Sequence, residues 1–373
     1  MEDLVVKTNQ NYQIEMDKKL KDSYRGKKVL VTGHTGFKGA WICQVLLECG
    51  AEVFGYSLAP NTEPNLYSIL KLKKHLKESI ADIRGIRIFN EAVEKYQPDI
   101  IFHLAAQPIV RRSYDQPHYT YETNVVGTVN VLEAIRLNQI PAGVIITTDK
   151  VYKNLERDYA YKEDDQLGGY DPYSTSKACA DLVTGSYIQS YFNPSEYKKS
   201  HQTLIASARG GNVIGGGDWA SDRLIPDAIR SFLADGGELI IRNPKAIRPW
   251  QHVLEPLSGY LKLGIELLAG RQKFSGAWNF GPAESDMQNV ETVLALLIAK
   301  INKGKYTVQP DKSKHEAGNL KLDNSKARKL LDWQPKFNLE RAVEATALWY
   351  RDFYQGEKEM VRVTSAQIKD YFG

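Results

Sequence analysis

Cysteine is scarce in this sequence, with three residues in a chain of 373. Cys43, Cys49 and Cys179 form no CxxC pair, and their odd number leaves one without a partner. This pattern excludes the disulfide framework of a small secreted protein and argues against a cysteine-rich zinc site. We therefore expect three structural thiols and no metal centre.

Long apolar runs are also missing. Even residues 41–59 are interrupted by Gln44, Glu48 and Glu52, whereas a membrane-spanning helix needs about 18 consecutive apolar residues or more. The N-terminal segment mixes acidic and basic side chains and lacks the apolar stretch of a secretory signal. These absences predict a cytoplasmic protein that does not bind membranes.

Neither sign of charge is in large excess. The chain has 49 Lys+Arg against 45 Asp+Glu, for a formal net charge of +4, and its basic residues are scattered. Nucleic-acid binding would require a basic stripe or basic residues interleaved with aromatic ones, so we expect no nucleic-acid partner. A composition of 42% hydrophobic and 25% charged residues is typical of a folded globular chain.

From residue 27 onward, short β-branched runs alternate with helix-length segments. The runs that predict buried strands are residues 27–32, 52–56, 99–105, 143–148 and 204–208. The segments that predict helices are residues 40–50, 90–96, 121–137 and 174–191. Near-continuous apolar strands alternating with helices predict an α/β protein with a Rossmann-type, doubly wound parallel sheet.

The alternation of strand-like and helix-like segments becomes less regular after residue 210. We predict a polar, loosely held leader over residues 1–25, a nucleotide-binding Rossmann domain over residues 26–210, and a smaller mixed α/β lobe over residues 211–373. That lobe is expected to bind mainly substrate and to return some strands and helices to the Rossmann domain. Ligands of open α/β sheets bind at the carboxyl ends of the strands, which places the expected site between the two parts.

Three glycines follow the first predicted strand and open the next helix. Gly33, Gly36 and Gly39 are spaced by three residues, and in this context they allow a tight turn that presents a helix N-terminus to a dinucleotide diphosphate. The second strand ends in GYSLAP, which has no acid for the adenosine ribose and no nearby arginine for a 2′-phosphate. NAD is therefore favoured over NADP, with weak retention. Asp82, after a likely third strand, is a candidate adenine contact or a solvated loop residue.

Two further motifs carry proton-transfer groups. Tyr173 and Lys177 are four residues apart on a predicted helix, so they share a face, and a nearby cation would lower the pKa of the phenol and make it a base. Thr148, Asp149 and Lys150 follow a strand that ends at the same cleft. Thr148 can bond the reacting hydroxyl, while the next two residues supply an acid and a potential base, unless they form a surface ion pair.

Several longer segments amount to a family resemblance. VTGHTGFKG, HLAAQPIVRRSY, TTDKVY, YDPYSTSKA and NVIGGGDW resemble the extended short-chain dehydrogenase/reductase family. Within it, the segments GFKGAW, LGGYDPYSTSKACADLV, GGGDWASDRLIPD and NPKAIRPWQHVLEPLSGYL are similar to those of the CDP-glucose 4,6-dehydratases. The resemblance covers the chain from Gly26 to about Pro282.

The resemblance implies an NAD-dependent lyase reaction of deoxysugar biosynthesis for surface polysaccharide. Tyr173, with Lys177 and Thr148, would remove the proton of the glucose 4-hydroxyl while a hydride leaves C4 for NAD⁺. Lys150 would then take the proton on C5, and Asp149 would protonate the departing 6-hydroxyl. Return of the hydride to C6 would give CDP-4-keto-6-deoxy-glucose and water.

The resemblance also implies the ligand contacts. Those expected for the cofactor, besides Tyr173 and Lys177, are Gly33, Thr35, Gly36, Phe37, Gly39, Ser57, Asp82, Ile83, Leu104, Ala105 and Ala106. Those expected for the substrate are Gln107, Asn212, Arg223, Arg248, Trp250, His252 and Asn279. Arg248 suits a diphosphate, whereas Trp250 and His252 could equally pack the C-terminal lobe, and Asn279 could equally be a structural turn residue.

Other functions remain as alternatives. The inverting dehydratases of UDP-N-acetylglucosamine share the Thr-Asp-Lys string, although RPWQHV and GGGDW argue against them. A 4-epimerase needs no acid–base pair at positions 149 and 150, and dTDP-glucose dehydratases would carry Glu in place of Lys150. A non-catalytic NAD-binding scaffold could lose Tyr173, Lys177 or Asp149, yet all are present.

The resemblance also implies self-association. In relatives, the helix that carries Tyr173 and the helix before it pair with their copies in a second subunit. Val125, Val129, Val131 and Leu132 are compatible with such pairing and equally with ordinary core packing. A homodimer is expected, with a tetramer as the alternative.

Overall fold

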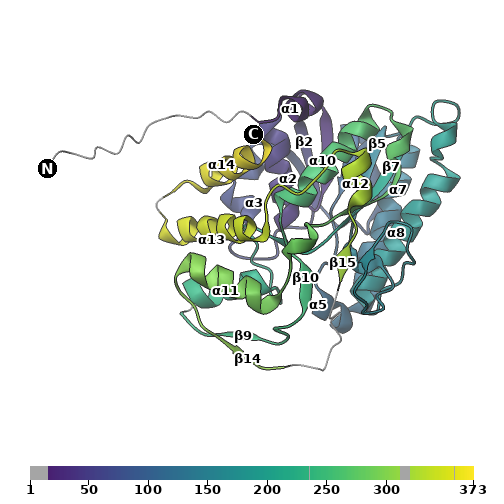
Figure 1. Ribbon diagram of the computed structural model, residues 1–373. Coiled ribbons are helices and arrows are strands. Elements are labelled where there is room, and N and C mark those ends of the chain that lie inside the picture. The colour runs from purple at the N-terminus through teal and green to yellow at the C-terminus, as the bar shows by residue number, and fades with distance from the viewer. Residues whose placement is uncertain (1–15, 235, 311–319, 357) are drawn as a thin grey trace.

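The computed structural model describes residues 16–234, 236–310, 320–356 and 358–373. A seven-stranded sheet runs through the centre of the molecule (Figure 1), with the strand order β12-β7-β5-β4-β1-β2-β3 and every pairing parallel. Its strands are β1 (Lys28–Thr32), β2 (Glu52–Ser57), β3 (Lys77–Ile80), β4 (Ile100–His103), β5 (Ala142–Thr148), β7 (Leu204–Gly210) and β12 (Gly276–Phe280). The predicted Rossmann-type fold is confirmed.

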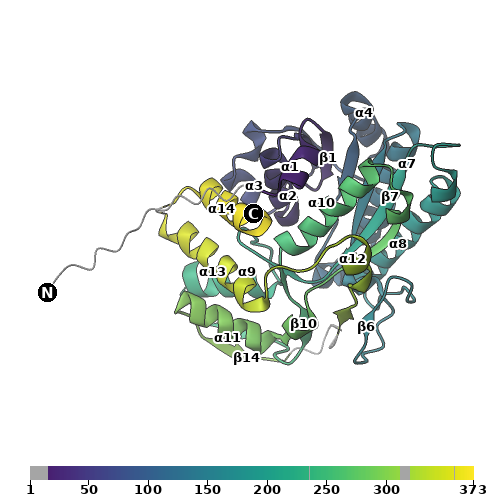
Figure 2. The same ribbon diagram turned by 45° about the horizontal axis from the view of Figure 1, so that its top comes forward.

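Helices cover both faces of this sheet (Figure 2). Helices α1 and α2 pack with α10 on one face, and α4, α7 and α8 pack side by side on the other. Their bounds are α1 (Lys18–Tyr24), α2 (Phe37–Glu48), α4 (Ile86–Tyr96), α7 (Gly127–Leu137), α8 (Pro172–Ser190) and α10 (Leu254–Leu268). Because both faces are covered, β5 and β7 are buried at every position, as near-continuous apolar strands require.

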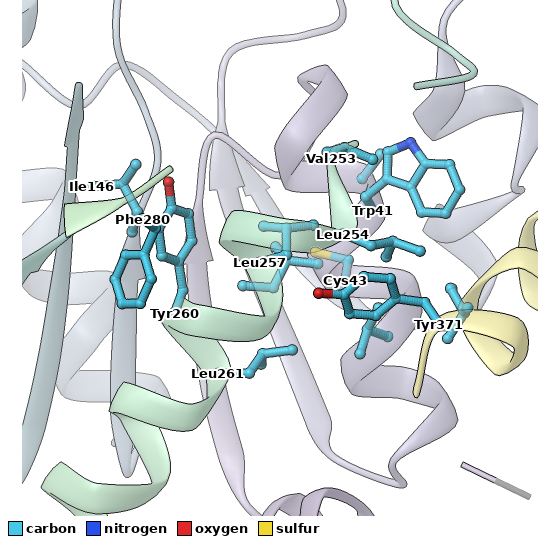
Figure 3. Packing of buried hydrophobic residues seen from close by; sticks show 14 of the residues in the cluster. Trp41, Cys43, Ile146, Val253, Leu254, Leu257, Tyr260, Leu261, Phe280 and Tyr371 are labelled. Atoms are coloured by element: carbon cyan, nitrogen blue, oxygen red, sulfur yellow. The ribbon is translucent and has the colours of Figure 1, made fainter. Parts of the chain in front are cut away.

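Alternate residues of each strand enter two separate cores. Val29 and Val31 of β1 belong to the larger core, whereas Leu30 between them belongs to the smaller one on the opposite face. Figure 3 shows part of the larger core, in which Trp41 of α2, Leu257 of α10 and Tyr371 of the C-terminal helix belong to one cluster. The two cores fix the strand ends that bear the candidate site.

The sheet also fixes where a ligand can bind. From β1 the chain continues to β2 and β3 on one side, and then crosses to β4, β5 and β7 on the other. The carboxyl ends of β1 and β4 therefore diverge at a topological switch point, where open α/β sheets bind their ligands.

Further helices, helical turns and short strands connect and flank the elements of the central sheet. The helices and helical turns are α3 (Leu66–Ile69), α5 (Val110–Asp115), α6 (Pro117–Tyr121), η2 (Glu122–Val126), η3 (Asp149–Val151), α9 (Leu224–Ile229), η5 (Arg230–Ala234), α11 (Val290–Ile301), α12 (Ser325–Leu330), α13 (Leu339–Gln355) and α14 (Met360–Phe372). Four two-stranded sheets pair β6 (Ala160–Tyr161) with β15 (Lys321–Leu322), β8 (Val213–Ile214) with β11 (Gln251–His252), β9 (Leu239–Ile241) with β14 (Tyr306–Val308), and β10 (Ile247–Pro249) with β13 (Met287–Asn289). From residue 211 onward, β12 joins the central sheet and α10 packs on its face.

The N-terminal segment differs in part from the predicted leader, of which residues 1–15 lie outside the described residues. Residues 18–24 form α1, whose Leu20 and Tyr24 are buried. The Tyr24 hydroxyl donates to the Leu261 carbonyl of α10 at 2.8 Å. This end of the segment is packed rather than loosely held, because its two apolar side chains complete the core beside α10.

In the part of the chain that the structure describes, no helix is long and apolar enough to cross a membrane. Within the same residues, no group of three or more His, Cys, Asp or Glu side chains is arranged to hold a metal ion.

Candidate active site

A cleft of about 1160 Å³ opens at the carboxyl ends of the central strands. Its lining contains every residue predicted to contact the cofactor, from the glycine loop after β1 to the segment after β4. Thr148, Lys150, Tyr173 and Lys177 also line it, whereas Asp149 lies behind Thr148 and Lys150. The sheet thus brings residues from distant parts of the sequence to one place.

The glycine loop is shaped for close approach of a ligand. Gly33 has a φ of +74°, and a Cβ there would lie 2.8 Å from the Ala105 nitrogen. A Cβ on Gly39 would lie 2.0 Å from the Gly33 carbonyl oxygen. Gly36 precedes α2 without a capping side chain, so the first backbone N–H groups of the helix face the cleft. This cradle fits the diphosphate of a dinucleotide.

At the far end of the loop, no carboxylate follows β2. The Ser57 hydroxyl instead lies 2.9 Å from the Thr35 hydroxyl, which also donates to the Leu58 carbonyl. Asp82 lines the cleft, but both of its carboxylate oxygens accept hydrogen bonds from Arg84. Those bonds lower the pKa of Asp82, so this carboxylate is already engaged by a side chain of the protein.

The proton-transfer groups gather where β5 meets α8. The Asp171 side chain caps α8 by accepting from the Ser174 N–H at 3.0 Å, which fixes the helix start that carries Tyr173. The Thr148 hydroxyl donates to Asp149 Oδ1 at 2.8 Å and also forms a hydrogen bond with Tyr173. One threonine therefore joins the phenol to the carboxylate.

Asp149 and Lys150 form an ion pair in which the carboxylate is buried and the lysine side chain is partly exposed to the cleft. Asp149 is 1% exposed, and its Oδ1 lies 3.6 Å from the Lys150 ammonium. The same ammonium donates to Asn212 Oδ1 at 3.3 Å. The other carboxylate oxygen, Asp149 Oδ2, has no hydrogen-bond partner among the described residues. The pair is thus an ion pair directly after the strand end, as the alternative has it, but its carboxylate is shielded from solvent.

Burial, and not the interaction between their charges, sets the pKa values of Tyr173 and Lys177 on α8. Desolvation raises the pKa of Tyr173 to about 12, although its hydrogen bond with Thr148 opposes the shift. Desolvation lowers the pKa of Lys177 to about 8, opposed by Asp181. The Lys177 ammonium donates to the Ile146 carbonyl at 2.8 Å. The expected lowering of the phenol pKa by Lys177 is thus not observed in this arrangement.

A buried ionic network supports the strand ends from below. Asp181 of α8 pairs with Arg209 of β7 at 2.8 Å and accepts from the Thr147 hydroxyl at 2.8 Å. Arg209 also donates to the Tyr152 hydroxyl. This network ties α8, β5 and β7 together directly beneath Thr148, so the positions of the proton-transfer groups depend on it.

Two of the predicted substrate contacts, His252 and Asn279, lie outside the cleft lining. His252 is fully buried, and its ring packs edge-on against Trp41 because β11 directs it into the core. The Asn279 amide donates to the Tyr161 and Asp323 carbonyls and accepts from the Tyr152 hydroxyl. Both side chains hold elements of the protein together, and neither lines the cleft.

The other predicted substrate contacts, Gln107, Asn212, Arg223, Arg248 and Trp250, do line the cleft. Sequence reasoning missed Arg111 and Arg242, which line it too. Both lie near Asp222, at 3.9 and 3.2 Å, and Arg223 pairs with Asp218 at 2.7 Å. Clustered guanidinium groups in one cleft fit a ligand with a diphosphate.

Lys38 was missed as well. In the GFKGAW segment, contacts were predicted for the glycines and Phe37 alone, although Lys38 stands between two of these glycines and lines the cleft. Its ammonium lies 5.9 Å from the centre of the Tyr260 ring.

A family model described as GDP-mannose 4,6 dehydratase matches residues 30–346. The chain belongs to the GDP-mannose 4,6-dehydratase family. Among curated members of related function, a CDP-glucose 4,6-dehydratase of Salmonella typhimurium is 45% identical over 353 residues, which is 94% of this chain and 98% of that protein. A UDP-glucose 4-epimerase of Mycolicibacterium smegmatis is 28% identical, covering 87% of this chain and 99% of that protein.

Solved structures share the fold of this dehydratase-family chain. The dTDP-glucose 4,6-dehydratase DesIV of Streptomyces venezuelae, with NAD and TYD bound, gives a TM-score of 0.75 at 23% identity, covering 89% of this chain and 99% of that one. A UDP-glucose 4-epimerase of Thermotoga maritima, with UDP-glucose, gives a TM-score of 0.73 at 20% identity, covering 87% of this chain and 99% of that one. At these levels of sequence identity, the structural similarity establishes a shared fold alone.

Proposed function

We propose that this chain is a lyase that converts CDP-glucose to CDP-4-keto-6-deoxy-glucose and water, with NAD as its cofactor. The observation that carries the proposal is the pair of the buried Asp149 and the cleft-lining Lys150, joined through Thr148 to Tyr173. Epimerisation at C4 needs no such acid–base pair, whereas elimination of water across C5 and C6 needs both groups. The 45% identity to a CDP-glucose 4,6-dehydratase supports the choice of nucleotide.

Each group of the cluster has a defined task in this proposal. Tyr173 takes the proton of the sugar 4-hydroxyl, and the ketone that forms makes the proton on C5 acidic. A proton first passes from the Lys150 ammonium to the Asp149 carboxylate within their ion pair. The neutral Lys150 amine then removes the C5 proton, while the protonated Asp149 supplies the proton with which the 6-hydroxyl leaves as water. The glycine loop after β1 would hold NAD, which would supply a reversible hydride acceptor, so that the overall reaction would involve no net redox change.

The proton balance gives Thr148 a second task. In each turnover Tyr173 gains one proton and Asp149 loses one, while Lys150 returns its proton to C5. The cycle closes when a proton moves from Tyr173 to Asp149, and the Thr148 hydroxyl, which bonds Asp149 at 2.8 Å, lies between them. Lys177 is the cation that lies beside the phenol of Tyr173 in this proposal.

The guanidinium groups of the cleft hold the sugar nucleotide. Arg223 and Arg248, with Arg111 and Arg242, supply positive charge for the two phosphates. Gln107, Asn212 and Trp250 are the remaining substrate contacts in this proposal, and the glycine loop with Thr35, Ser57 and the segment after β4 holds the dinucleotide. The chain is proposed to act in the cytoplasm in deoxysugar biosynthesis.

The association state is part of the same proposal. Val131 and Leu132 of α7 are buried in the smaller core, so they are not available to a second subunit. Val126 and Leu182 on the outer surface of the same helical layer are 48% and 58% exposed. We propose that this layer pairs with its copy in a homodimer.

A panel of sugar nucleotides tests the function. The purified protein is incubated with NAD⁺ and, separately, with CDP-, dTDP-, UDP- and GDP-hexoses, and the products are weighed by mass spectrometry. Loss of one water from CDP-glucose alone is the expected result. Loss from UDP-N-acetylglucosamine but not from CDP-glucose would assign the chain to the inverting dehydratases, and no loss from any donor would overturn the enzymatic function.

A further inference from the structure

Tyr260 of α10 carries a buried hydroxyl close to the proton-transfer groups. The side chain is fully buried, and its hydroxyl has no hydrogen-bond partner among the described residues. The ring packs edge-on against Phe280 in the larger core, as Figure 3 shows, so its position is fixed. Burial raises the pKa of Tyr260, and the hydroxyl therefore keeps its proton. A buried donor without an acceptor is rare in native proteins and calls for an explanation.

The hydroxyl reaches the end of β7 because Gly210 has no side chain. A Cβ on Gly210 would lie 2.6 Å from the Tyr260 hydroxyl oxygen, which is closer than a Cβ can approach. Gly210 pairs with Thr148 at the end of β5, and Asp149 follows directly in the chain. The glycine thus admits the hydroxyl to the strand end beside which the catalytic carboxylate lies.

Asp149 has a buried polar atom of the same kind. Its Oδ1 accepts from the Thr148 hydroxyl at 2.8 Å and lies 3.6 Å from the Lys150 ammonium. Its Oδ2 is buried, and no side chain or backbone group in the described part of the chain donates to it. Because buried carboxylate oxygens accept hydrogen bonds in stable proteins, Oδ2 requires a further donor.

One water molecule can satisfy both atoms. The charge of Asp149 acts on the Tyr260 hydroxyl, yet no hydrogen bond joins the two side chains directly. The Lys38 ammonium adds a second donor, since it lies 3.8 Å from the same Cβ position on Gly210. A buried water needs about two to four polar partners. A water that accepts from Tyr260 and Lys38 and donates to Asp149 Oδ2 meets that requirement.

We propose that Tyr260 is a positioning residue for the acid of the elimination step: through one bound water, its hydroxyl supplies the donor for Asp149 Oδ2 and so keeps the transferred proton on Oδ1. This role rests on the function proposed above. Oδ1 is the oxygen beside Lys150, from which the proton comes. Without a donor, Oδ2 competes with Oδ1 for that proton.

The elimination step balances with Tyr260 protonated throughout. The proton on Asp149 Oδ1 passes to O6 as the C6–O6 bond breaks, and the electrons of that bond leave with O6. The C5 proton passes to the Lys150 amine, and the electrons of the C5–H bond form the double bond between C5 and C6.

Tyr260→Phe tests this role, because it removes the hydroxyl and leaves the ring. In a single turnover with CDP-glucose and NAD⁺, the reduced dinucleotide should form at the wild-type rate, since oxidation at C4 does not use Asp149. Its decay should slow by on the order of tenfold, because a hydrogen bond to a charged group is lost. The affinity for CDP, measured by calorimetry, should stay unchanged.

Tyr24→Phe is the matched control. It also removes a buried tyrosine hydroxyl next to α10, one that donates to the Leu261 carbonyl, and the variant should turn over like the wild type. Decay of the reduced dinucleotide at the wild-type rate in Tyr260→Phe would overturn the proposal. Weaker binding of CDP to that variant would assign the hydroxyl to the substrate and overturn it as well.

A crystal structure of the wild type tests the water site without any turnover. Density for a water within about 3.2 Å of both the Tyr260 hydroxyl and Asp149 Oδ2, lost in Tyr260→Phe, is the expected result. A wild type with no water at this place overturns the proposal. If the wild-type chain releases no water from CDP-glucose, the proposed function fails and the role of Tyr260 falls with it, whereas a defect confined to the variant leaves that function intact.

Discussion

Tyr173 and Lys177 show how strongly burial governs the titrating groups of this cleft. Their separation of one helical turn suggested that the lysine would lower the pKa of the phenol, yet that pKa is about 12 and the pKa of the lysine is about 8. Both shifts disfavour the charged form, as desolvation does. In the cleft as the structure shows it, Tyr173 is therefore held in its neutral form.

Lys150→Ala should separate the two halves of the reaction. The variant keeps Tyr173, so oxidation at C4 should persist, but loss of the C5 base should slow the release of water by about 10²–10⁴-fold. The reduced cofactor should then accumulate, which absorbance in a single turnover would detect.

Lys150→Arg is the matched control. Arginine keeps the positive charge but cannot be deprotonated in a protein, so it should fail in the same way if the lysine is a base. Release of water at the wild-type rate from either variant would show that the base lies elsewhere.

Sequence reasoning located much of the site because strand ends and helix faces are periodic features. Thr148, Lys150 and Tyr173 come together in the cleft as their positions on a strand end and a helix start suggested. The burial of His252 and Asn279 could not be predicted, because the sequence does not show which face of a short strand points to the core. Lys38 was overlooked because its contact, the ring of Tyr260 on α10, lies far away from it in the sequence.

At the scale of elements, Glu255 of α10 holds the C-terminal part of the chain. It is fully buried and accepts from the backbone N–H groups of Lys336 and Phe337 and from the Tyr371 hydroxyl of α14. Burial raises its pKa from 4.5 to about 7, although these hydrogen bonds oppose the shift. The carboxyl group therefore binds a proton more tightly in the folded chain than in the unfolded one.

This shift predicts a dependence of stability on pH. Between about pH 5 and pH 7 the folded state carries more protons on Glu255, so its contribution to the free energy of unfolding falls as the pH rises, and is constant above that range. The change is at most about 3 kcal/mol. Urea unfolding of the wild type and of Glu255→Gln, at about pH 5 and pH 8, should show the difference between them shrinking with pH.

The exposed Glu94 provides the control for that experiment. Glu94→Gln should change stability equally at both pH values, because this side chain is exposed to solvent in the folded chain as it is in the unfolded one. A pH-independent difference for Glu255→Gln would show that its titration does not contribute.

The bounds of elements formed by an unbroken apolar run were predicted closely, whereas those of the other elements were not. The predicted strand over residues 143–148 is β5 (Ala142–Thr148). The predicted helix over residues 121–137 is divided by a wider turn, η2, before α7. The packing of α1 was missed because its surface is rich in lysine and only two of its side chains are buried.

At the scale of the whole molecule, the proposed dimer makes a distinct prediction. Leu182→Glu would place a charge within a surface that is buried in the dimer, and should shift the chain toward the monomer in sedimentation experiments. Leu330, which is 49% exposed on α12, provides the matched control, and Leu330→Glu should remain dimeric. A Leu182→Glu variant that sediments like the wild type would place the interface elsewhere, and a wild type with twice the dimer mass would indicate a tetramer.

The edge strand β12 has a consequence for synthesis of the protein. The other six strands of the central sheet are complete once Gly210 has been made. The outer edge of β7 is then still unpaired, and β12 covers it only when residues 276–280 have been added. Unpaired strand edges recruit other chains. A growing polypeptide on the ribosome therefore carries this open edge until most of its length has emerged, and a chain terminated between residues 210 and 276 should aggregate rather than persist as a separate nucleotide-binding unit.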